Sequence, residues 1–207
     1  MTVIGSSRPL ILGSASPWRR KELEAIGLPF IVMTADIDEK AIRHPDPAVL
    51  TWHIAAAKAA ALLGRIAEPS LLITCDQVAV FRGEIREKPC CAEQARRWLA
   101  EYGVGEEPVS TVTTVVVTDT ATRRSCHATD VAKAWFEPLP AKAVELALAR
   151  GDVLHSCGAF TIDDPDLGPF VSMVEGDGDE AEISSSISGL PRARTLALLQ
   201  RAADWLR

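Results

Sequence analysis

The segment that most constrains this chain runs from Leu71 to Phe81 and reads LLITCDQVAVF. Apart from Thr74, Asp76 and Gln77 it is apolar and largely β-branched, which is typical of a strand buried in a sheet. A turn and the short run 82–86 follow, and they predict a hairpin. The chain is therefore expected to fold around a sheet that carries a carboxylate inside it.

Helical and strand patterns alternate along the first half of the chain. Ser16 and Pro17 suit the N-cap and first position of a helix that ends at Gly27. Asp46-Pro47 opens a second helix, which ends before Gly64. Further helices are expected at 92–102, at 138–150 and over the C-terminal residues around 196–206, and strands at 9–13, 29–34, 71–81, 84–86, 109–118, 124–137, 158–162 and 170–174.

Because paired strands follow the alternating half, the pattern predicts an α/β fold with a mixed sheet and helices on its faces. With 207 residues the chain is expected to form a single domain over 1–207, with a two-lobed form as the alternative. The polar stretch 176–188, GDGDEAEISSSIS, predicts a mobile loop.

Composition excludes several classes of function. The net charge is −6, so no global basic field is available to hold a nucleic acid. Five cysteines without CxxC spacing, two of them adjacent at Cys90 and Cys91, argue against a disulfide framework and favour a reducing cytoplasm. No apolar run is long enough to cross a bilayer, so no membrane partner is expected.

One acidic residue and one acidic group are candidates for chemistry. Asp76 lies inside an apolar strand, where a carboxylate must be paired, bound to a metal or catalytic; a structural hydrogen bond is the alternative. Asp36, Asp38 and Glu39 form a second acidic group, for which a solvated loop is the simpler interpretation.

Four basic residues are candidates for binding phosphate. Arg19 and Arg20 lie in the first turn of a helix, beside two serines; the helix dipole disfavours cations there, but the free N–H groups attract an anion. Lys58 lies at the edge of an apolar helix stripe, and Lys88 precedes a proline. Simple solvation is the alternative for each of them.

Together, two carboxylates, helix-end donors and two lysines suit metal-assisted attack of water on a polyphosphate. The sequence contains no P-loop, HExxH or GxSxG motif, and its four histidines lack metal-ligand spacing. A thiol nucleophile at Cys157, beside His155, is a weaker alternative.

The chain resembles the Maf family of nucleotide pyrophosphatases through motifs in the same order and at matching spacing. The motifs are Ser14-Ala15-Ser16-Pro17-Trp18-Arg19, Asp36-Ile37-Asp38-Glu39, Ala55-Ala56-Ala57-Lys58-Ala59, Asp76-Gln77, Lys88-Pro89 and Gly189-Leu190-Pro191.

The resemblance implies an elongated mixed sheet around a central cleft, commonly in a homodimer, and hydrolysis of a nucleoside triphosphate between its α and β phosphates with Mg²⁺ or Mn²⁺. It implies these roles: Ser14 and Arg19 hold phosphate, Glu39 and Asp76 serve the metal and the attacking water, and Lys58 and Lys88 neutralise the polyphosphate.

Trp18 and Gln77 resemble the subfamily associated with 7-methyl-GTP, since other members carry Arg and Thr at these positions. An aromatic face or a carboxylate such as Asp163 suits a cationic base. Departures from the family pattern are Thr74, Thr114, Cys157 and the long acidic segment 176–188. The alternatives are a Maf enzyme acting on dTTP or UTP and a non-catalytic nucleotide-binding regulator of cell division.

Overall fold

The computed structural model describes residues 8–104 and 106–206. The described chain divides into two compact units. Unit 1 comprises the described residues of Met1–Asp76, Thr113–Asp130 and Gly189–Arg207, and unit 2 comprises those of Gln77–Val112 and Val131–Ser188.

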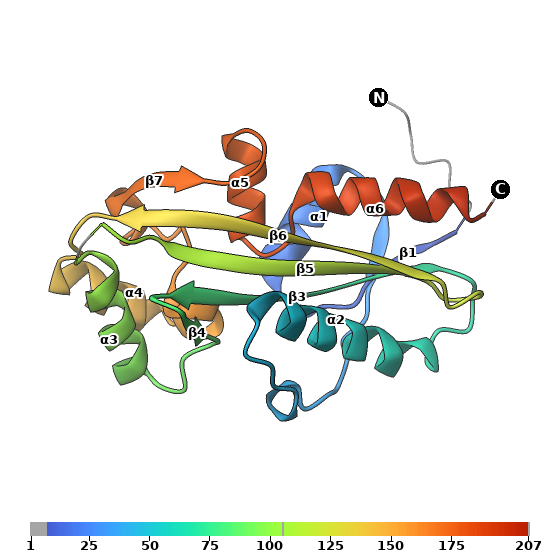
Figure 1. Ribbon diagram of the computed structural model, residues 1–207, viewed down its shortest axis with the longest axis horizontal. Helices are drawn as coiled ribbons and strands as arrows, with labels where there is room; N and C mark the ends of the chain where they lie inside the picture. The colour runs from blue at the N-terminus through green and yellow to red at the C-terminus, as the bar shows by residue number, and fades with distance from the viewer. Residues whose placement is uncertain (1–7, 105, 207) are drawn as a thin grey trace. The chain divides into compact units, whose positions relative to one another are not determined.

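The secondary structure is of the α/β type, as the sequence predicts (Figure 1). The described strands form one sheet in the order β2-β1-β3-β5-β6-β7, with β4 paired to β3. The strands are β1 Leu10–Leu12, β2 Phe30–Val32, β3 Leu71–Phe81, β4 Glu84–Arg86, β5 Val109–Asp119, β6 Ser125–Phe136 and β7 Val171–Glu175. The α-helices are α1 Pro17–Ile26, α2 Pro47–Leu63, α3 Ala92–Tyr102, α4 Ala141–Arg150, α5 Glu180–Ile187 and α6 Arg192–Asp204.

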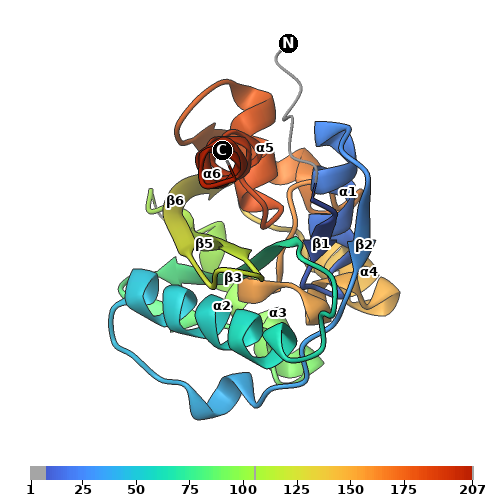
Figure 2. The same cartoon turned by 90° about the vertical axis from the view of Figure 1, so that its right-hand side faces the viewer.

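In unit 1, strand β1 lies between two parallel partners. Leu10 pairs with Phe30 of β2 on one side and with Leu71 of β3 on the other. Helix α1 connects β1 to β2, and α2 connects β2 to β3, so the two crossovers run in opposite directions. Because such crossovers are right-handed, the two helices must cover opposite faces of the sheet. Figure 2 shows this arrangement, with α1 and α6 on one face and α2 on the other.

The first half of β3 divides its side chains between these two faces. Leu71, Ile73 and Cys75 pack with residues of α1 and α6 in one core cluster. Leu72 packs against α2 in another cluster. Thr74 faces α2 as well, since its hydroxyl donates to the Ala55 carbonyl at 2.8 Å. The period of two therefore directs Asp76 toward α2.

Unit 2 is built on a single core that is rich in aromatic residues. Tyr102 at the end of α3 contacts Phe81, Phe136 and Phe160, with ring centroids 5.1, 5.8 and 5.8 Å away. Its hydroxyl donates to the Gly158 carbonyl at 2.7 Å, so the buried oxygen is satisfied.

Two expectations for unit 2 are wrong. The segment 176–188 contains helix α5, whose N-cap Asp179 accepts from the Glu182 amide at 2.9 Å. Ile183 and Ile187 lie four residues apart and pack into the core. The N-terminus of a helix dipole is positive and stabilises negative charges in the first turn. The acidic residues that suggest a loop in the sequence therefore stabilise the start of α5.

The expected strand 158–162 is also absent from the described structure. Gly158 and Ala159 have φ values of +66° and +61°, which no strand contains. A Cβ added to Gly158 would lie 2.6 Å from the Ala79 Cβ, so this glycine is required by close packing.

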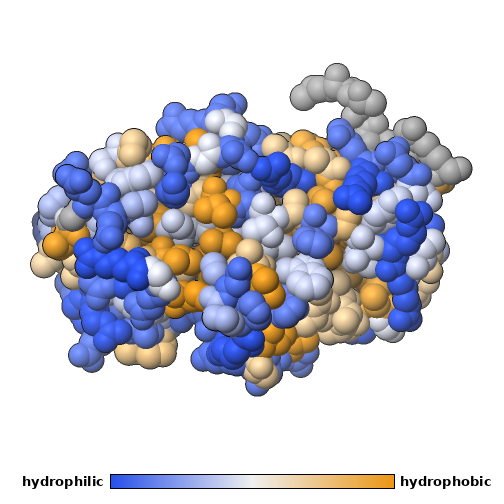
Figure 3. Space-filling view, in the orientation of Figure 1, coloured by the Kyte–Doolittle hydropathy of each residue, from blue (hydrophilic) through white to orange (hydrophobic). Residues whose placement is uncertain are grey.

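Hydrophobic residues are exposed among hydrophilic ones on the face shown in Figure 3. Within residues 8–104 and 106–206, no helix combines the length and the apolar character that crossing a membrane requires. All five cysteines are thiols.

Candidate active site

At the carboxyl ends of β1 and β2, two segments of the chain turn toward β3. After β1, the Gly13 amide donates to the Ile73 carbonyl of β3 at 2.7 Å, and the chain turns into α1. After β2, the Met33 amide donates to the Leu12 carbonyl at 3.0 Å, and the chain continues to Glu39. Because α1 follows β1 on one face and α2 follows β2 on the other, this edge is a topological switch point, where α/β folds bind ligands.

The turn after β1 is shaped by close packing. A Cβ on Gly13 would lie 2.7 Å from the Thr74 Cγ2, so a larger residue would separate β1 from β3. The Ser14 hydroxyl accepts from the Ser16 amide at 3.2 Å, and the Ser16 hydroxyl accepts from the Arg19 amide at 3.4 Å. Ser16 is thus the N-cap of α1, as the sequence predicts, and the first turn of the helix begins beside Ser14.

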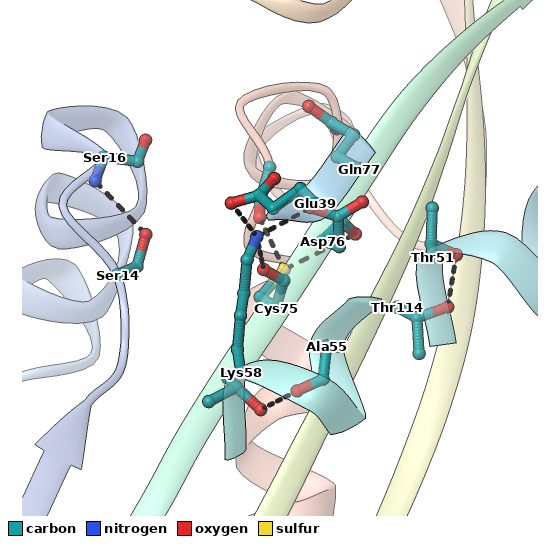
Figure 4. A network of polar contacts seen from close by, with 12 residues as sticks. Ser14, Ser16, Glu39, Thr51, Ala55, Lys58, Cys75, Asp76, Gln77 and Thr114 are labelled. Atoms are coloured by element: carbon teal, nitrogen blue, oxygen red, sulfur yellow. Dashed lines mark hydrogen bonds and ion pairs between the residues drawn. The ribbon is translucent and has the colours of Figure 1, made fainter. Parts of the chain in front are cut away.

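Asp76, Lys58 and Glu39 form the centre of the site (Figure 4). The Lys58 Nζ lies 2.8 Å from the Asp76 Oδ1 and 3.1 Å from the Glu39 Oε1. The two carboxylate oxygens are therefore at most 5.9 Å apart, the sum of 2.8 and 3.1. Asp76 and Lys58 are buried, whereas the Glu39 side chain is 44% exposed, so Glu39 connects the buried pair to solvent.

Arg19 is fixed beside this centre. Its Nη1 donates to the Cys75 carbonyl at 2.8 Å, and its Nε donates to the Gly189 carbonyl at 3.1 Å. Arg20 differs, because it is exposed and pairs with Glu24 one helical turn away. Of the two candidate arginines, Arg19 lies beside Asp76, whereas Arg20 is exposed and paired within α1.

The charges around Asp76 act on its pKa in opposite directions. Burial raises the pKa of Asp76 and is the largest effect, while Lys58 and Arg19 lower it and Glu39 raises it. The net result is a pKa above the ordinary carboxyl value. A carboxylate of this kind is a better proton acceptor than an exposed one, which suits a general base.

The two carboxylates also fit one divalent cation. Magnesium is held by one or two protein carboxylates, with water and substrate phosphates as its other ligands. Within the described residues, no group of three or more His, Cys, Asp and Glu is placed to hold a metal. Glu39 and Asp76 can therefore supply a partial oxygen shell that a polyphosphate completes, whereas a site made entirely of protein ligands is not formed there.

Three predicted site residues belong to unit 2. The Gln77 amide nitrogen donates to the Ser186 and Ile187 carbonyls at 2.9 and 3.2 Å, and its oxygen accepts from the Cys157 thiol at 3.3 Å. Gln77 thus binds the end of α5, and Cys157 holds the Gln77 side chain. Lys88 is exposed in the bend between β4 and α3. Asp163 is exposed as well, and its neighbour Asp164 is buried in an ion pair with Arg150.

Trp18 lies in the first turn of α1 and is half-buried. The Lys21 ammonium is 6.0 Å from the centroid of its ring. The indole therefore already has a cation at the outer limit of a cation–π contact.

Sequence reasoning gave Gly189 no role, although its carbonyl accepts from Arg19 and also from the Cys75 thiol, at 3.1 Å. Its φ of +100° explains why a glycine is needed there. Thr114, a departure from the family pattern, exchanges hydrogen bonds of 2.8 Å with the Thr51 and Thr129 hydroxyls. Only the glycine had a sequence signal, as part of the Gly189-Leu190-Pro191 motif.

The geometry defines a class: an α/β protein with a buried carboxylate, flanked by a lysine and an arginine, at the carboxyl ends of parallel strands. The comparisons with known proteins give the family. A family model described as "Maf-like protein" matches residues 9–202, and the chain belongs to this family.

Its relatives include a 7-methyl-GTP pyrophosphatase of Dictyostelium discoideum, 38% identical over 206 residues, which cover 96% of this chain and 100% of that protein. A nucleoside triphosphate pyrophosphatase of Synechococcus sp. (strain JA-3-3Ab) is 36% identical and covers 81% of this chain and 84% of its own length. A dTTP/UTP pyrophosphatase of Pelotomaculum thermopropionicum is 29% identical, with 94% and 96% covered.

Proposed function

We propose that this protein is a nucleoside triphosphate pyrophosphatase that hydrolyses the bond between the α and β phosphates of 7-methyl-GTP, giving 7-methyl-GMP and pyrophosphate. The observation that carries the reaction is the Glu39–Lys58–Asp76 group beside Arg19. The full-length similarity to the Dictyostelium enzyme supports the substrate.

Each residue of the site has a separate role in the proposed reaction. Asp76 accepts a proton from the attacking water, because burial makes its carboxylate a stronger base than an exposed one. Lys58 holds that carboxylate in place and balances its charge. Ser14, the first-turn amides of α1 and Arg19 bind phosphate oxygens and stabilise the charge that develops on them.

Glu39 and Asp76 would hold a divalent cation, Mg²⁺ or Mn²⁺, which polarises the phosphate when it is bound. Their oxygens, at most 5.9 Å apart, need only a small approach to share one ion. The Lys58 Nζ contacts both of these oxygens, so a bound cation would take its place between them and leave the ammonium to neutralise the phosphates. The resemblance, rather than this geometry, supports Lys88 as a further phosphate ligand and Asp163 as a contact of the base.

A nucleotide panel tests the proposal. Purified protein is incubated with 7-methyl-GTP, GTP, UTP and dTTP, each with Mg²⁺ or Mn²⁺, and the products are separated by ion exchange. We expect the monophosphate and pyrophosphate in equal amounts, with the highest kcat/KM for 7-methyl-GTP. Release of orthophosphate and a diphosphate instead would contradict cleavage between the α and β phosphates.

Two other results of the nucleotide panel would change the proposal, one its substrate and the other its reaction. Preference for UTP or dTTP would reject the substrate and retain the reaction, as in the Pelotomaculum relative. No turnover of any nucleotide with either metal, together with saturable nucleotide binding, would support the non-catalytic regulator.

A further inference from the structure

Cys90 and Cys91 differ from the other three cysteines of the chain. Both are exposed, and the Cys90 thiol donates to the Cys91 sulfur, with the two Sγ atoms 3.7 Å apart. Cys75 and Cys126 are buried, and burial raises the pKa of each thiol. Cys157 is half-buried and donates to Gln77. Only the adjacent pair thus combines exposure with a second sulfur in contact.

The start of helix α3 activates one thiol of the pair. Cys91 is the N-cap of α3, where unpaired amides and the helix dipole favour a negative charge. Although its sulfur makes no regular capping hydrogen bond, the Gln94 amide lowers the pKa of Cys91, and the Cys90 thiol lowers it further. Cys90 is held next to it, since its amide donates to the Gln94 Oε1 at 2.7 Å.

We propose that Cys90 and Cys91 form a redox modification site, at which hydrogen peroxide converts the two thiols to a disulfide. The Cys91 thiolate attacks the peroxide, so that an S–O bond forms as the O–O bond breaks, and the released hydroxide takes a proton and leaves as water. The Cys90 sulfur then attacks Cys91, forming the S–S bond and releasing a second water. Two thiols lose two electrons, and one peroxide is reduced to two waters.

The covalent geometry makes this disulfide a reversible modification. Adjacent Cα atoms are about 3.8 Å apart across a trans peptide, whereas disulfides usually join Cα atoms about 4.4–6.8 Å apart. The ring therefore strains the backbone, and strained, exposed disulfides are readily reduced by thiols. The same strain falls at the start of α3, two residues after Lys88.

A consequence for hydrolysis rests on the proposed function. If Lys88 binds phosphate, closing the ring moves its segment and lowers kcat/KM until a reductant restores it. Mass and thiol measurements test the modification itself, without any assay of activity, so that the two parts of the inference can fail separately.

The experiment treats the reduced full-length protein, Cys90→Ser, Cys91→Ser and the control Cys157→Ser with one equivalent of hydrogen peroxide. We expect the mass of wild type and of Cys157→Ser to fall by two hydrogens. Peptide mapping should place this loss in the peptide that contains both Cys90 and Cys91. Cys90→Ser should stop at a sulfenic acid on Cys91, which dimedone traps. Cys91→Ser should react several-fold more slowly.

Three results would overturn the site: no mass loss in wild type, equal rates in Cys91→Ser and wild type, or disulfides only between molecules. If the disulfide forms and kcat/KM is unchanged, control of the Lys88 segment is rejected. A reduced protein that forms the disulfide but hydrolyses no nucleotide rejects the proposed function and leaves the redox site standing.

Discussion

Each unit of the protein buries a cation, and the two cations have different surroundings. In unit 1, Lys58 contacts two carboxylates, one buried and one half-exposed, and no aromatic ring contact is found for it among the described residues. In unit 2, the Arg86 guanidinium lies over the rings of Phe81, Trp98 and Tyr102, at 4.8, 5.4 and 5.2 Å from their centroids. It also pairs with Glu101 and Glu84.

The difference separates the proposed reactive centre from a structural one. The Arg86 side chain is only 3% exposed, and three aromatic rings pack around its guanidinium. Lys58 is held by carboxylates that can instead bind a cation or water, and Glu39 opens the group to solvent. Burial of charge alone does not indicate catalysis; partners that can be exchanged do.

The largest expected effect is that of Asp76→Asn, which keeps the size of the side chain and removes its charge. Turnover should fall by about 10²–10⁴-fold, because the base and a metal ligand are lost together. The check is kcat, measured on protein whose thermal unfolding shows that it is folded.

Asp130→Asn is the matched control for this variant. Asp130 is also a buried carboxylate of unit 1, and it pairs with Arg194 instead of the site. Its turnover should stay near that of wild type. Equal losses in the two variants would mean that Asp76 acts through stability.

Arg86→Ala tests the other side of the comparison. Removing a guanidinium packed between three rings should lower the free energy of unfolding by about 2–4 kcal/mol, since a cavity and the cation–π contacts are lost together. Turnover per folded molecule should not change. Urea denaturation and kcat measure the two effects separately.

Arg82→Ala is its control, because Arg82 lies 5.0 Å from the same Phe81 ring but is half-exposed and pairs with Glu107 at the surface. Arg82→Ala should lower the free energy of unfolding by less than about 1 kcal/mol. A similar loss of unfolding free energy in both arginine variants would mean that the burial of Arg86 does not increase its contribution to stability.

These two centres also show how far the sequence could be used for prediction. Asp76 stands out because an apolar strand has one carboxylate in it, and the partner lysine is marked by its place on an apolar helix stripe. Arg86 has no such signal, since Trp98 and Tyr102 of α3 meet Phe81 of β3 only through tertiary packing. Alternation predicts the parallel strands of unit 1, and once the order β2-β1-β3 is known, right-handed crossovers assign the faces that α1 and α2 cover.

What the sequence could not supply has physical causes. The polar residues of 176–188 predict a loop, whereas in helix α5 Ser185 and Ser186 are buried, and the Ser185 hydroxyl donates to the Glu182 carbonyl within the helix. The resemblance predicts that the Gln77 side chain binds substrate. In the structure its amide nitrogen donates to the Ser186 carbonyl, and this contact depends on tertiary packing alone. Its role toward a nucleotide stays a prediction.

Arg19→Ala should have a moderate effect. A guanidinium that binds phosphate contributes about 1–3 kcal/mol, so kcat/KM should fall by roughly 5–150-fold. Arg20→Ala, which changes the next residue of the same helix, should leave kcat/KM near wild type because Arg20 pairs only with Glu24 among the contacts found for it. Loss of activity in both variants would point to damage to α1.

The pH dependence gives a further test of the same environment. Because the pKa of Asp76 is raised and the base must be ionised, kcat/KM should rise with pH along a limb above the ordinary carboxyl value of about 3.9. Arg19 lowers this pKa, so Arg19→Ala should move the limb to higher pH, whereas Arg20→Ala should not. If the limb lies at the same pH in wild type, Arg19→Ala and Arg20→Ala, it does not report the ionisation of Asp76.

The smallest effect is expected for specificity at Trp18. Stacking of a cationic base on an indole is worth about 0.5–2 kcal/mol over a neutral base, so wild type should prefer 7-methyl-GTP to GTP by roughly 2–30-fold. Lys21 already lies 6.0 Å from the ring centroid, and a cationic base must displace or share that contact. Trp18→Arg should erase the preference by repulsion and leave cleavage of neutral nucleotides nearly unchanged, whereas Trp18→Phe should keep part of it. The ratio of kcat/KM values for the two nucleotides measures this directly, because uniform damage to phosphate binding lowers both values and leaves their ratio constant. A preference that survives in Trp18→Arg would move recognition of the base away from α1, and Asp163 would be the next residue to change.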